Sequence, residues 1–521
     1  MFKSFFTISF FISLSRILGF IRDILIARYI GVSVLSDAFF GAFRVPNFFR
    51  RVFAEGAFNS AFVPIFIEKI NYKNNDESPQ NTRYFLANIF SILLFSLLIF
   101  VIIFQIFMPF FMKILFPGFF ADPFKSQQLV SFSRITIFYL IFISLVSLFS
   151  GVLNSINKFA VPASSPIILN SILILVVLFF GKFFPNYGYA LSWGVFVAGI
   201  MQFIVVSYAV YKNGYLVYPK IPKLNADIKK FFRKLLPGIV GANVMQINLL
   251  VDSIFASAIA GGVSYLYYAD RINQLPLAMI GIAIGIALLP NLSRRIKSGE
   301  FDSAIKLQNT ALEASLILVM PATLALTILS YPIISTLFQR GAFGENETNF
   351  VSKALMFYSF GLPSFVLVKV MEPAFFSRLD TKTPMKIALC CLCSNIGLNY
   401  IFYLAQLGFV GIILASVISS YLNLSLLIIN LLRKKLFYFE NHFLKKLLLI
   451  IIPSLLMAFV LLFLNKYFSL KHNFNNIIEL SIMIIAGLIS YFIASFYSGS
   501  LDILIGVLKL KRKKNDQPPS Q

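Results

Sequence analysis

Charged residues and the side chains typical of catalytic or metal sites are scarce in this chain of 521 residues. Only 13% of the residues are charged, against about 25% in ordinary soluble domains, and 58% are hydrophobic. The chain has two histidines, and its three cysteines (Cys390, Cys391 and Cys393) share one apolar run without a histidine nearby. These shortages exclude a soluble globular enzyme, a disulfide framework and a cysteine–histidine zinc site. Nucleotide-binding and nucleophile motifs such as the Walker loop are also missing.

Long apolar runs, by contrast, recur from the first residues to about position 508. Because about 20 mostly apolar residues cross a bilayer as a helix, these runs predict an all-α polytopic membrane protein with fourteen transmembrane helices. The predicted spans are 5–29, 34–54, 84–112, 129–153, 163–184, 187–211, 235–260, 264–292, 307–336, 351–376, 385–405, 409–432, 446–466 and 475–507. No cleaved signal peptide is expected, since Arg16, Arg22 and Asp23 interrupt the first apolar run.

The formal net charge of +24 is explained by where the basic residues lie. Lysine and arginine are concentrated in alternate connections between the predicted spans, as in the linker 212–234 and the tail 509–521. Since basic residues are retained on the inner side of a membrane, this alternation predicts that both termini are cytoplasmic. The charge therefore requires no nucleic-acid partner, and the tail is expected to lie beside anionic membrane lipids.

Two short patterns recur with the spacing of an internal repeat. The pattern P-N-x-x-R-R occurs at 46–51 and again at 290–295. The turn 155–162 likewise resembles 377–384. These matches predict two six-helix lobes related by a pseudo-two-fold axis along the membrane normal, because six is an even number of crossings. The predicted parts are an N-terminal lobe (1–211), a basic cytoplasmic linker (212–234), a C-terminal lobe (235–433), two extra helices (434–508) and a basic disordered tail (509–521).

Arginines that remain inside predicted spans are the most informative residues, because an arginine at the centre of a membrane helix costs about 2.5–3.5 kcal/mol. Arg16, Arg22 and Arg271 lie well inside their spans, whereas Arg50 lies at the inner end of its span. They suggest a cationic cavity that selects an anion, since guanidinium groups bind phosphate oxygens bidentately. Structural salt bridges are the alternative for the first three, and a side chain reaching the headgroups is the alternative for Arg50.

One face of the second span is polar. Its residues on a single helical stripe are Asp37, Arg44, Arg51 and Glu55. Asp23 lies seven residues after Arg16, on one side of the first helix, whereas Arg22 and Arg50 have no evident partner in their own helices. The stripe predicts that the second span has a face in contact with water.

Further polar residues inside spans suggest an ion site. Asp252 could bind Na⁺ or a proton, and Asn395 and Asn399, one helical turn apart, could add oxygen ligands. Hydrogen-bonded packing is the alternative for all three residues. Lys369 and Glu372 are three residues apart and predict a local ion pair.

Several longer motifs together resemble one family. They are S-R-I-L-G-F-I-R-D at 15–23, S-D-A-F-F at 36–40, P-N-F-F-R-R-V-F-A-E-G-A-F at 46–58, A-F-V-P at 61–64, Y-Y-A-D-R at 267–271, F-Q-R-G-A-F at 338–343 and K-T-P at 382–384. With these motifs the sequence resembles the MurJ (MviN) family of lipid II flippases over essentially the whole chain. The first 65 residues carry the most specific part of this resemblance.

The resemblance implies the fold of the multidrug/oligosaccharidyl-lipid/polysaccharide exporter superfamily, with a C-terminal helix pair beside two lobes. It implies that the protein moves lipid II, an undecaprenyl-pyrophosphate-linked precursor, from the inner to the outer leaflet of the bacterial inner membrane for peptidoglycan and cell wall synthesis. The family's cavity arginines fall on Arg16, Arg22, Arg50 and Arg271, and its acidic gating or counter-ion positions fall on Asp23, Asp37 and Glu55. No cofactor is implied, and cell-wall synthesis proteins are expected partners.

Coupling to Na⁺ or protons stays open. Some members of the family have a sodium site that Asp252 matches, but Asn399 stands where a second carboxylate is expected.

Other functions also stay open at this stage. A superfamily antiporter of small cationic drugs predicts a cavity dominated by carboxylates, whereas arginine dominates the first two spans. A flippase for another polyprenyl-linked oligosaccharide shares all the features above. A polyprenyl-phosphate glycosyltransferase or phosphatase requires a histidine–aspartate cluster that the sequence does not offer, and a non-transporting scaffold would not depend on the buried arginines.

Overall fold

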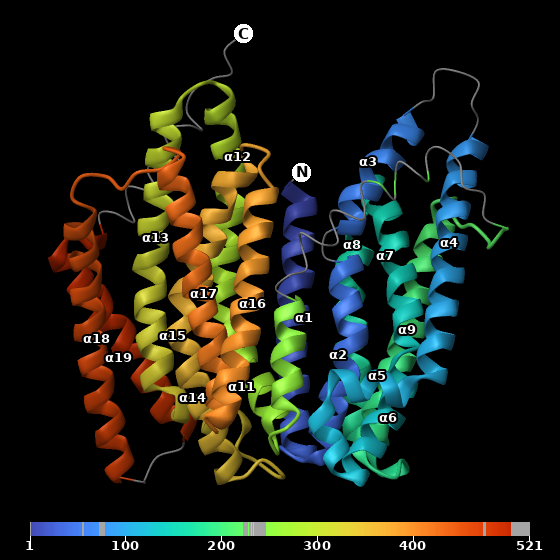
Figure 1. The fold of residues 1–521 in the computed structure, drawn as a ribbon, viewed down its shortest axis with the longest axis horizontal. Coiled ribbons are helices and arrows are strands. Elements are labelled where there is room, and N and C mark those ends of the chain that lie inside the picture. The colour runs from blue at the N-terminus through green and yellow to red at the C-terminus, as the bar shows by residue number, and fades with distance from the viewer. Residues whose placement is uncertain are drawn as a thin grey trace. The chain divides into compact units, whose positions relative to one another are not determined.

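The computed structural model describes residues 2–54, 57–71, 79–221, 246–471 and 476–501, together with Ile228, Phe231 and Arg233. The described residues form helices joined by short connections, and they divide into two compact units (Figure 1). Unit 1 comprises Met1–Ser264 and Arg340–Phe343, and unit 2 comprises Tyr265–Gln339 and Gly344–Gln521. The domain boundaries drawn from the sequence stay a prediction.

Unit 1 carries three of the four predicted arginines. Its α-helices are α1 (Phe2–Ile30), α2 (Val34–Ala54), α3 (Ala57–Asn71), α4 (Pro79–Ile106), α5 (Met108–Leu115), α6 (Pro123–Thr136), α7 (Tyr139–Ser155), α8 (Ala160–Leu175), α9 (Tyr187–Lys212) and a helix at Gln246–Ala256. Its other helical segments are η1 (Pro117–Ala121), η2 (Val176–Phe180) and η3 (Gly181–Phe183). Helix α1 packs on α8, α2 packs on α6 and α7, and α7 packs on α9 (Figure 1). These contacts fix the two helices that bear Arg16, Arg22 and Arg50.

Unit 2 contains the remaining helices. They are α11 (Gly262–Pro276, whose first three residues belong to unit 1), η4 (Leu277–Ile282), α12 (Ala283–Lys297), α13 (Phe301–Ile328), α14 (Ser330–Phe338), α15 (Glu345–Phe376), α16 (Lys382–Leu404), α17 (Gly408–Arg433), α18 (Phe443–Lys471) and α19 (Asn476–Ser498). The hydroxyl of Tyr491 on α19 donates to the carbonyl of Ile317 on α13 at 2.6 Å, which joins the last helix pair to the rest of the unit. The predicted local ion pair is confirmed, with Lys369 Nζ 3.1 Å from Glu372 Oε2.

Eleven helical segments among the described residues are long and apolar enough to cross a membrane. They match the predicted spans apart from the first, the second and the seventh. The first corresponds to α1, of 29 residues, and the second to α2, of 21 residues, which contains Asp37 and three arginines. The seventh, 235–260, is described only from Gln246. The protein is therefore a multi-pass helical membrane protein, and the total of fourteen spans stays a prediction.

Several predicted spans are interrupted in the structure. The apolar run 84–112 is divided between α4 and α5, and 307–336 is divided between α13 and α14 at Leu329. Within 264–292, a π-helical segment begins directly after Pro276, which cannot donate a backbone hydrogen bond. Hydropathy does not locate such breaks, because the residues around them remain apolar.

The two turns paired by the predicted repeat have the same backbone conformation. Asn157 and Leu379 occupy equivalent positions and both have a left-handed φ, of 60° and 61°. The next residue in each turn donates its N–H to the carbonyl five residues earlier, from Lys158 to Leu153 at 2.8 Å and from Asp380 to Phe375 at 3.0 Å. Both helices thus end with the same capping geometry. Other helices end in the same way, as α17 does where Lys435 has a φ of 54° and Leu436 donates to the carbonyl of Leu431 at 2.9 Å. The repeat and the symmetry of the two lobes therefore stay predictions.

Candidate functional site

Arg22 is buried inside α1, with 8% of its surface exposed. Its Nε and Nη2 donate to Oδ1 of Asp23 at 3.0 and 2.7 Å, and its Nη1 donates to Oδ1 of Asn170 on α8 at 2.9 Å. An isolated buried guanidinium is costly, so the carboxylate and the amide offset its loss of solvation. The expectation that Arg22 lacks a partner in its own helix is therefore wrong, because its partner is the next residue.

Asn170 connects this arginine to the backbone of α1. Its Nδ2 donates to the carbonyl oxygen of Ser15 at 3.0 Å, while its Oδ1 accepts from Arg22. The buried amide thus uses a donor at one end and an acceptor at the other, which fixes its orientation. Sequence reasoning missed Asn170. The available signal was an amide inside the mostly apolar span 163–184.

Arg16 and Arg50 have different surroundings. Arg16 is exposed on α1 and makes no hydrogen bond or ion pair with the residues that the structure describes. Arg50 is half-buried near the end of α2, and its Nε donates to Oδ1 of Asn47 at 2.9 Å. Asn47 lies one turn earlier, so the expectation that Arg50 lacks a partner in its own helix is also wrong. The guanidinium of Arg16 is open to a ligand.

Arg271 lies half-buried on α11, in unit 2, whereas the other three predicted arginines lie in unit 1. The preceding residue, Asp270, accepts a hydrogen bond from Nε2 of Gln274 one turn later. The grouping of all four arginines in one cavity stays a prediction. Glu55 lies outside the described residues.

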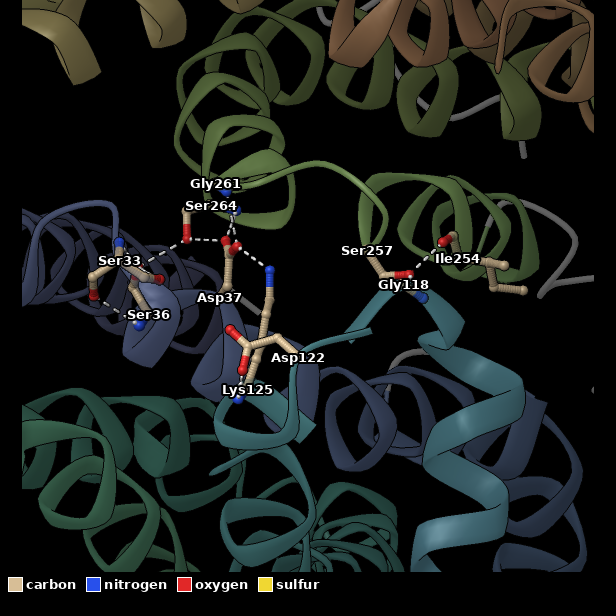
Figure 2. A network of polar contacts seen from close by, with 10 residues as sticks. All are labelled: Ser33, Ser36, Asp37, Gly118, Asp122, Lys125, Ile254, Ser257, Gly261 and Ser264. Carbon is tan, nitrogen blue, oxygen red and sulfur yellow. Dashed lines mark hydrogen bonds and ion pairs between the residues drawn. The ribbon is translucent and has the colours of Figure 1, made fainter. Parts of the chain in front are cut away.

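Asp37 is the centre of a buried polar network at the start of α2 (Figure 2). Its Oδ2 accepts from Lys125 Nζ on α6 at 3.1 Å and from the backbone N–H of Gly261 at 3.0 Å. Its Oδ1 accepts from the backbone N–H and the hydroxyl of Ser264, at 3.0 and 2.7 Å. The ammonium of Lys125 also lies 4.1 Å from the centre of the Phe119 ring. Four donors therefore hold one carboxylate that is 1% exposed.

This network anchors the first turn of α11 to α2. The first N–H groups of a helix have no partner within it, and a negative charge there also stabilises the helix dipole. The Asp37 carboxylate on α2 accepts the N–H of Ser264 and places a negative charge at the start of α11. The hydroxyls of Ser36 and Ser264 lie 3.0 Å apart beside it. Figure 2 shows a second link nearby, where the Ser257 hydroxyl accepts from the N–H of Gly118 at 3.0 Å. The helix that bears Arg271 thus starts from a charged anchor in unit 1.

The candidate ion ligands fall in different units. Asp252 is buried in the helix Gln246–Ala256 of unit 1. Asn395 and Asn399 are buried in unit 2, where Asn399 Nδ2 donates to Asn395 Oδ1 at 2.9 Å and Asn395 Nδ2 donates to the Ser416 hydroxyl at 3.2 Å. These bonds agree with the packing alternative for the two asparagines, and the ion site stays a prediction.

Comparison with known proteins assigns this architecture to one group. The family model "Lipid II flippase MurJ" matches residues 26–483, and so begins after Arg22 and Asp23. A relative from Rhizobium tropici, named "Probable lipid II flippase MurJ", is 35% identical over 509 residues, which covers 96% of this chain and 95% of that protein. This alignment extends over almost the entire sequence.

Solved structures give the same result for the fold. A structure described as "Lipid II flippase MurJ, inward closed conformation" matches with a TM-score of 0.77 and 29% identity, covering 95% of this chain and 99% of that one. An inward-facing multidrug resistance MATE family transporter of the MOP superfamily matches with a TM-score of 0.65 and 15% identity, over 81% of this chain and 94% of that one. At 15% identity, the second likeness concerns the fold alone.

Proposed function

Because the chain belongs to the lipid II flippase MurJ family, we propose that it moves lipid II from the inner to the outer leaflet of the bacterial inner membrane. It is a multi-pass membrane protein and a transporter rather than an enzyme. Its substrate carries a pyrophosphate between a long polyprenyl chain and a disaccharide-pentapeptide. Transport therefore requires a site for this anion inside the membrane.

The observation that best supports an anion site is the buried guanidinium of Arg22. A membrane helix tolerates a charge where it is paired or where it serves a ligand, and Arg22 has a carboxylate beside it that can act as a counter-ion. When the pyrophosphate binds, its oxygens replace part of the interaction with Asp23. Asn170 keeps the guanidinium oriented during this exchange, because it also bonds the backbone of α1.

Arg16 lies on the same helix and is exposed, so it supplies a second cation for the same pyrophosphate. Arg50 and Arg271 complete the cationic cavity in this proposal, which extends the family's pattern to their positions. Their half-buried side chains are compatible with a role in binding. Asp37 acts as a gate by holding or releasing the first turn of α11.

The transport cycle is alternating access between two six-helix lobes, with the last two helices as an addition and both termini in the cytoplasm. The charge distribution in the connections supports this orientation. Asp252 is the residue through which Na⁺ or protons are coupled to transport, since it is a buried carboxylate in a membrane helix. Cell-wall synthesis proteins receive the substrate on the outer side.

The test is the accessibility of lipid II at the outer leaflet of cells depleted of this protein. Complementation with the native protein should restore accessibility, whereas Arg16→Ala and Arg22→Ala proteins of equal abundance should not. The matched control is Arg134→Ala, since Arg134 is an exposed arginine in the last turn of α6. Restoration by all the variants would rule out the cationic site, and failure of the native protein would rule out the function.

A further inference from the structure

The C-terminal end of α1 is capped by a distant part of the chain. The last carbonyls of a helix have no partner within it. Helix α1 ends at Ile30, and Gly31 adopts a left-handed φ of +63° and donates its N–H to Ala27 at 2.9 Å. The carbonyl of Arg28, one residue further along, accepts the N–H of Ala342 from outside the helix at 2.8 Å. A turn between α14 and α15 thus completes the end of α1.

Two glycines allow the two backbones to approach this closely. A Cβ on Gly31 would lie 2.1 Å from the carbonyl oxygen of Ala342, and a Cβ on Gly341 would lie 2.3 Å from the carbonyl oxygen of Arg28. Gly341 also has a left-handed φ of +63°. A side chain at either position therefore forces the backbones apart as well as straining its own residue.

Other glycines of the chain separate these two effects. Gly299 and Gly408 have left-handed φ values of +77° and +59°, and neither would place a Cβ within 4 Å of another atom. Alanine at Gly299 or Gly408 therefore adds backbone strain alone. Alanine at Gly31 or Gly341 adds the same strain and also a steric clash with a carbonyl oxygen.

The capping turn belongs to unit 1, although the helices before and after it in the chain belong to unit 2. Arg340–Phe343 packs with unit 1, and Phe343 is buried there with 1% of its surface exposed. The helices on either side of this turn in the chain, α14 and α15, belong to unit 2. The end of the helix that bears Arg16 and Arg22 is therefore bonded to a segment that is continuous with unit 2.

We propose that Gly31, Gly341 and Ala342 form a clasp that positions α1 for lipid transport by fixing its end to the connection between α14 and α15. The clasp holds the C-terminal end of α1 in place during transport, while packing on α8 holds the rest of the helix. The inference rests on the proposed function, because it takes α1 as the helix that binds the pyrophosphate. The clasp acts on the transport step and leaves the side chains around Arg22 unchanged.

The experiment compares purified full-length Gly341→Ala and Gly299→Ala proteins in lipid vesicles. Three quantities are measured for each: the rate of lipid II flipping, the affinity for lipid II and the thermal unfolding midpoint. We expect Gly341→Ala to flip about 10- to 100-fold more slowly than Gly299→Ala, because the clash with the carbonyl oxygen of Arg28 strains the end of α1. Lipid II affinity should agree within about twofold between the two variants, because the contacts of Arg22 are retained.

Equal flipping rates for the two variants would overturn the clasp, as would a loss of affinity equal to the loss of rate. If native protein neither binds nor flips lipid II, the proposed function fails instead, and the two failures are thus distinguished.

If Gly341→Ala does not accumulate, Ala342→Pro is measured against Glu345→Pro. The first proline removes the capping N–H, and the second stands at the first position of α15, where proline is tolerated. If neither Gly341→Ala nor Ala342→Pro folds while both controls fold normally, the clasp is needed for folding, and its role in transport is overturned.

Discussion

At the scale of single residues, Asn170 joins the side chain of Arg22 to the backbone of the same helix through the two ends of one amide. An apolar residue at this position loses both bonds. This change leaves Arg22 with Asp23 as its closest partner and lets the guanidinium turn fully toward the carboxylate. The arginine is then less available to an incoming anion.

We predict that Asn170→Leu lowers the rate of lipid II flipping by about tenfold or more, since a hydrogen bond to a charged group contributes about 1.5–3 kcal/mol. Gln202→Leu is the matched control. Gln202 is also a buried amide, and its Nε2 donates to the backbone of α8 at Ser165 at 2.8 Å. Flipping by vesicles that contain equal amounts of folded protein measures the difference. An equal loss in both variants would mean that Asn170 only holds α8 in place.

At the scale of elements, the Asp37 network joins α2, α6 and the first turn of α11 through one carboxylate. Taking a carboxylate and an ammonium out of water is expensive, and the four donors around Asp37 are the compensation. Lys125 is itself 8% exposed, so neither partner can turn to solvent. Removal of one partner alone therefore leaves a buried charge without its counter-charge.

We predict that Lys125→Met lowers the free energy of unfolding by about 3–5 kcal/mol, and that Lys125→Met with Asp37→Asn loses clearly less than the sum of the two single changes. Denaturant unfolding in detergent measures all three variants. The control cycle is Lys434→Met with Asp380→Asn, because that ion pair of 3.2 Å is partly exposed and should couple by about 0–1 kcal/mol. A coupling energy between Asp37 and Lys125 no greater than that of the control pair would show that the buried position of this ion pair does not strengthen it.

The contacts of these elements differ in how far the sequence predicts them. The spacing of Lys369 and Glu372 predicted their ion pair because residues three apart are neighbours on a helix. Arg22 and Asn170 are 148 residues apart, and Asp37 and Lys125 are 88 apart, so no helical spacing rule relates them. Such pairs depend on which helices pack together, which the apolar pattern does not specify. The apolar run did predict the bounds of α2, Val34–Ala54, because about 20 mostly apolar residues cross a bilayer as a helix.

At the scale of the whole molecule, the family membership and the likeness of fold cover nearly the full chain. The sequence predicted this membership from motifs along essentially the whole chain, of which those in the first 65 residues are the most specific, and the structure adds the contacts of some of these residues. Arg22 and Asp37, both within the first 65 residues, are the centres of two separate polar networks. One network holds a cation inside α1, and the other anchors the helix that bears Arg271. We propose that the first of these networks binds the pyrophosphate of the transported lipid.

The most direct test is the affinity of purified protein for lipid II. We expect Arg22→Ala to weaken binding by about 10- to 100-fold, because a hydrogen bond to a charged group contributes about 1.5–3 kcal/mol. Arg22→Lys should also bind weakly, because an ammonium cannot contact Asp23, Asn170 and a phosphate with the fixed fork of a guanidinium. Arg134→Ala should bind like the native protein. An Arg22→Ala protein with native affinity for lipid II would show that the Arg22 network does not bind the pyrophosphate.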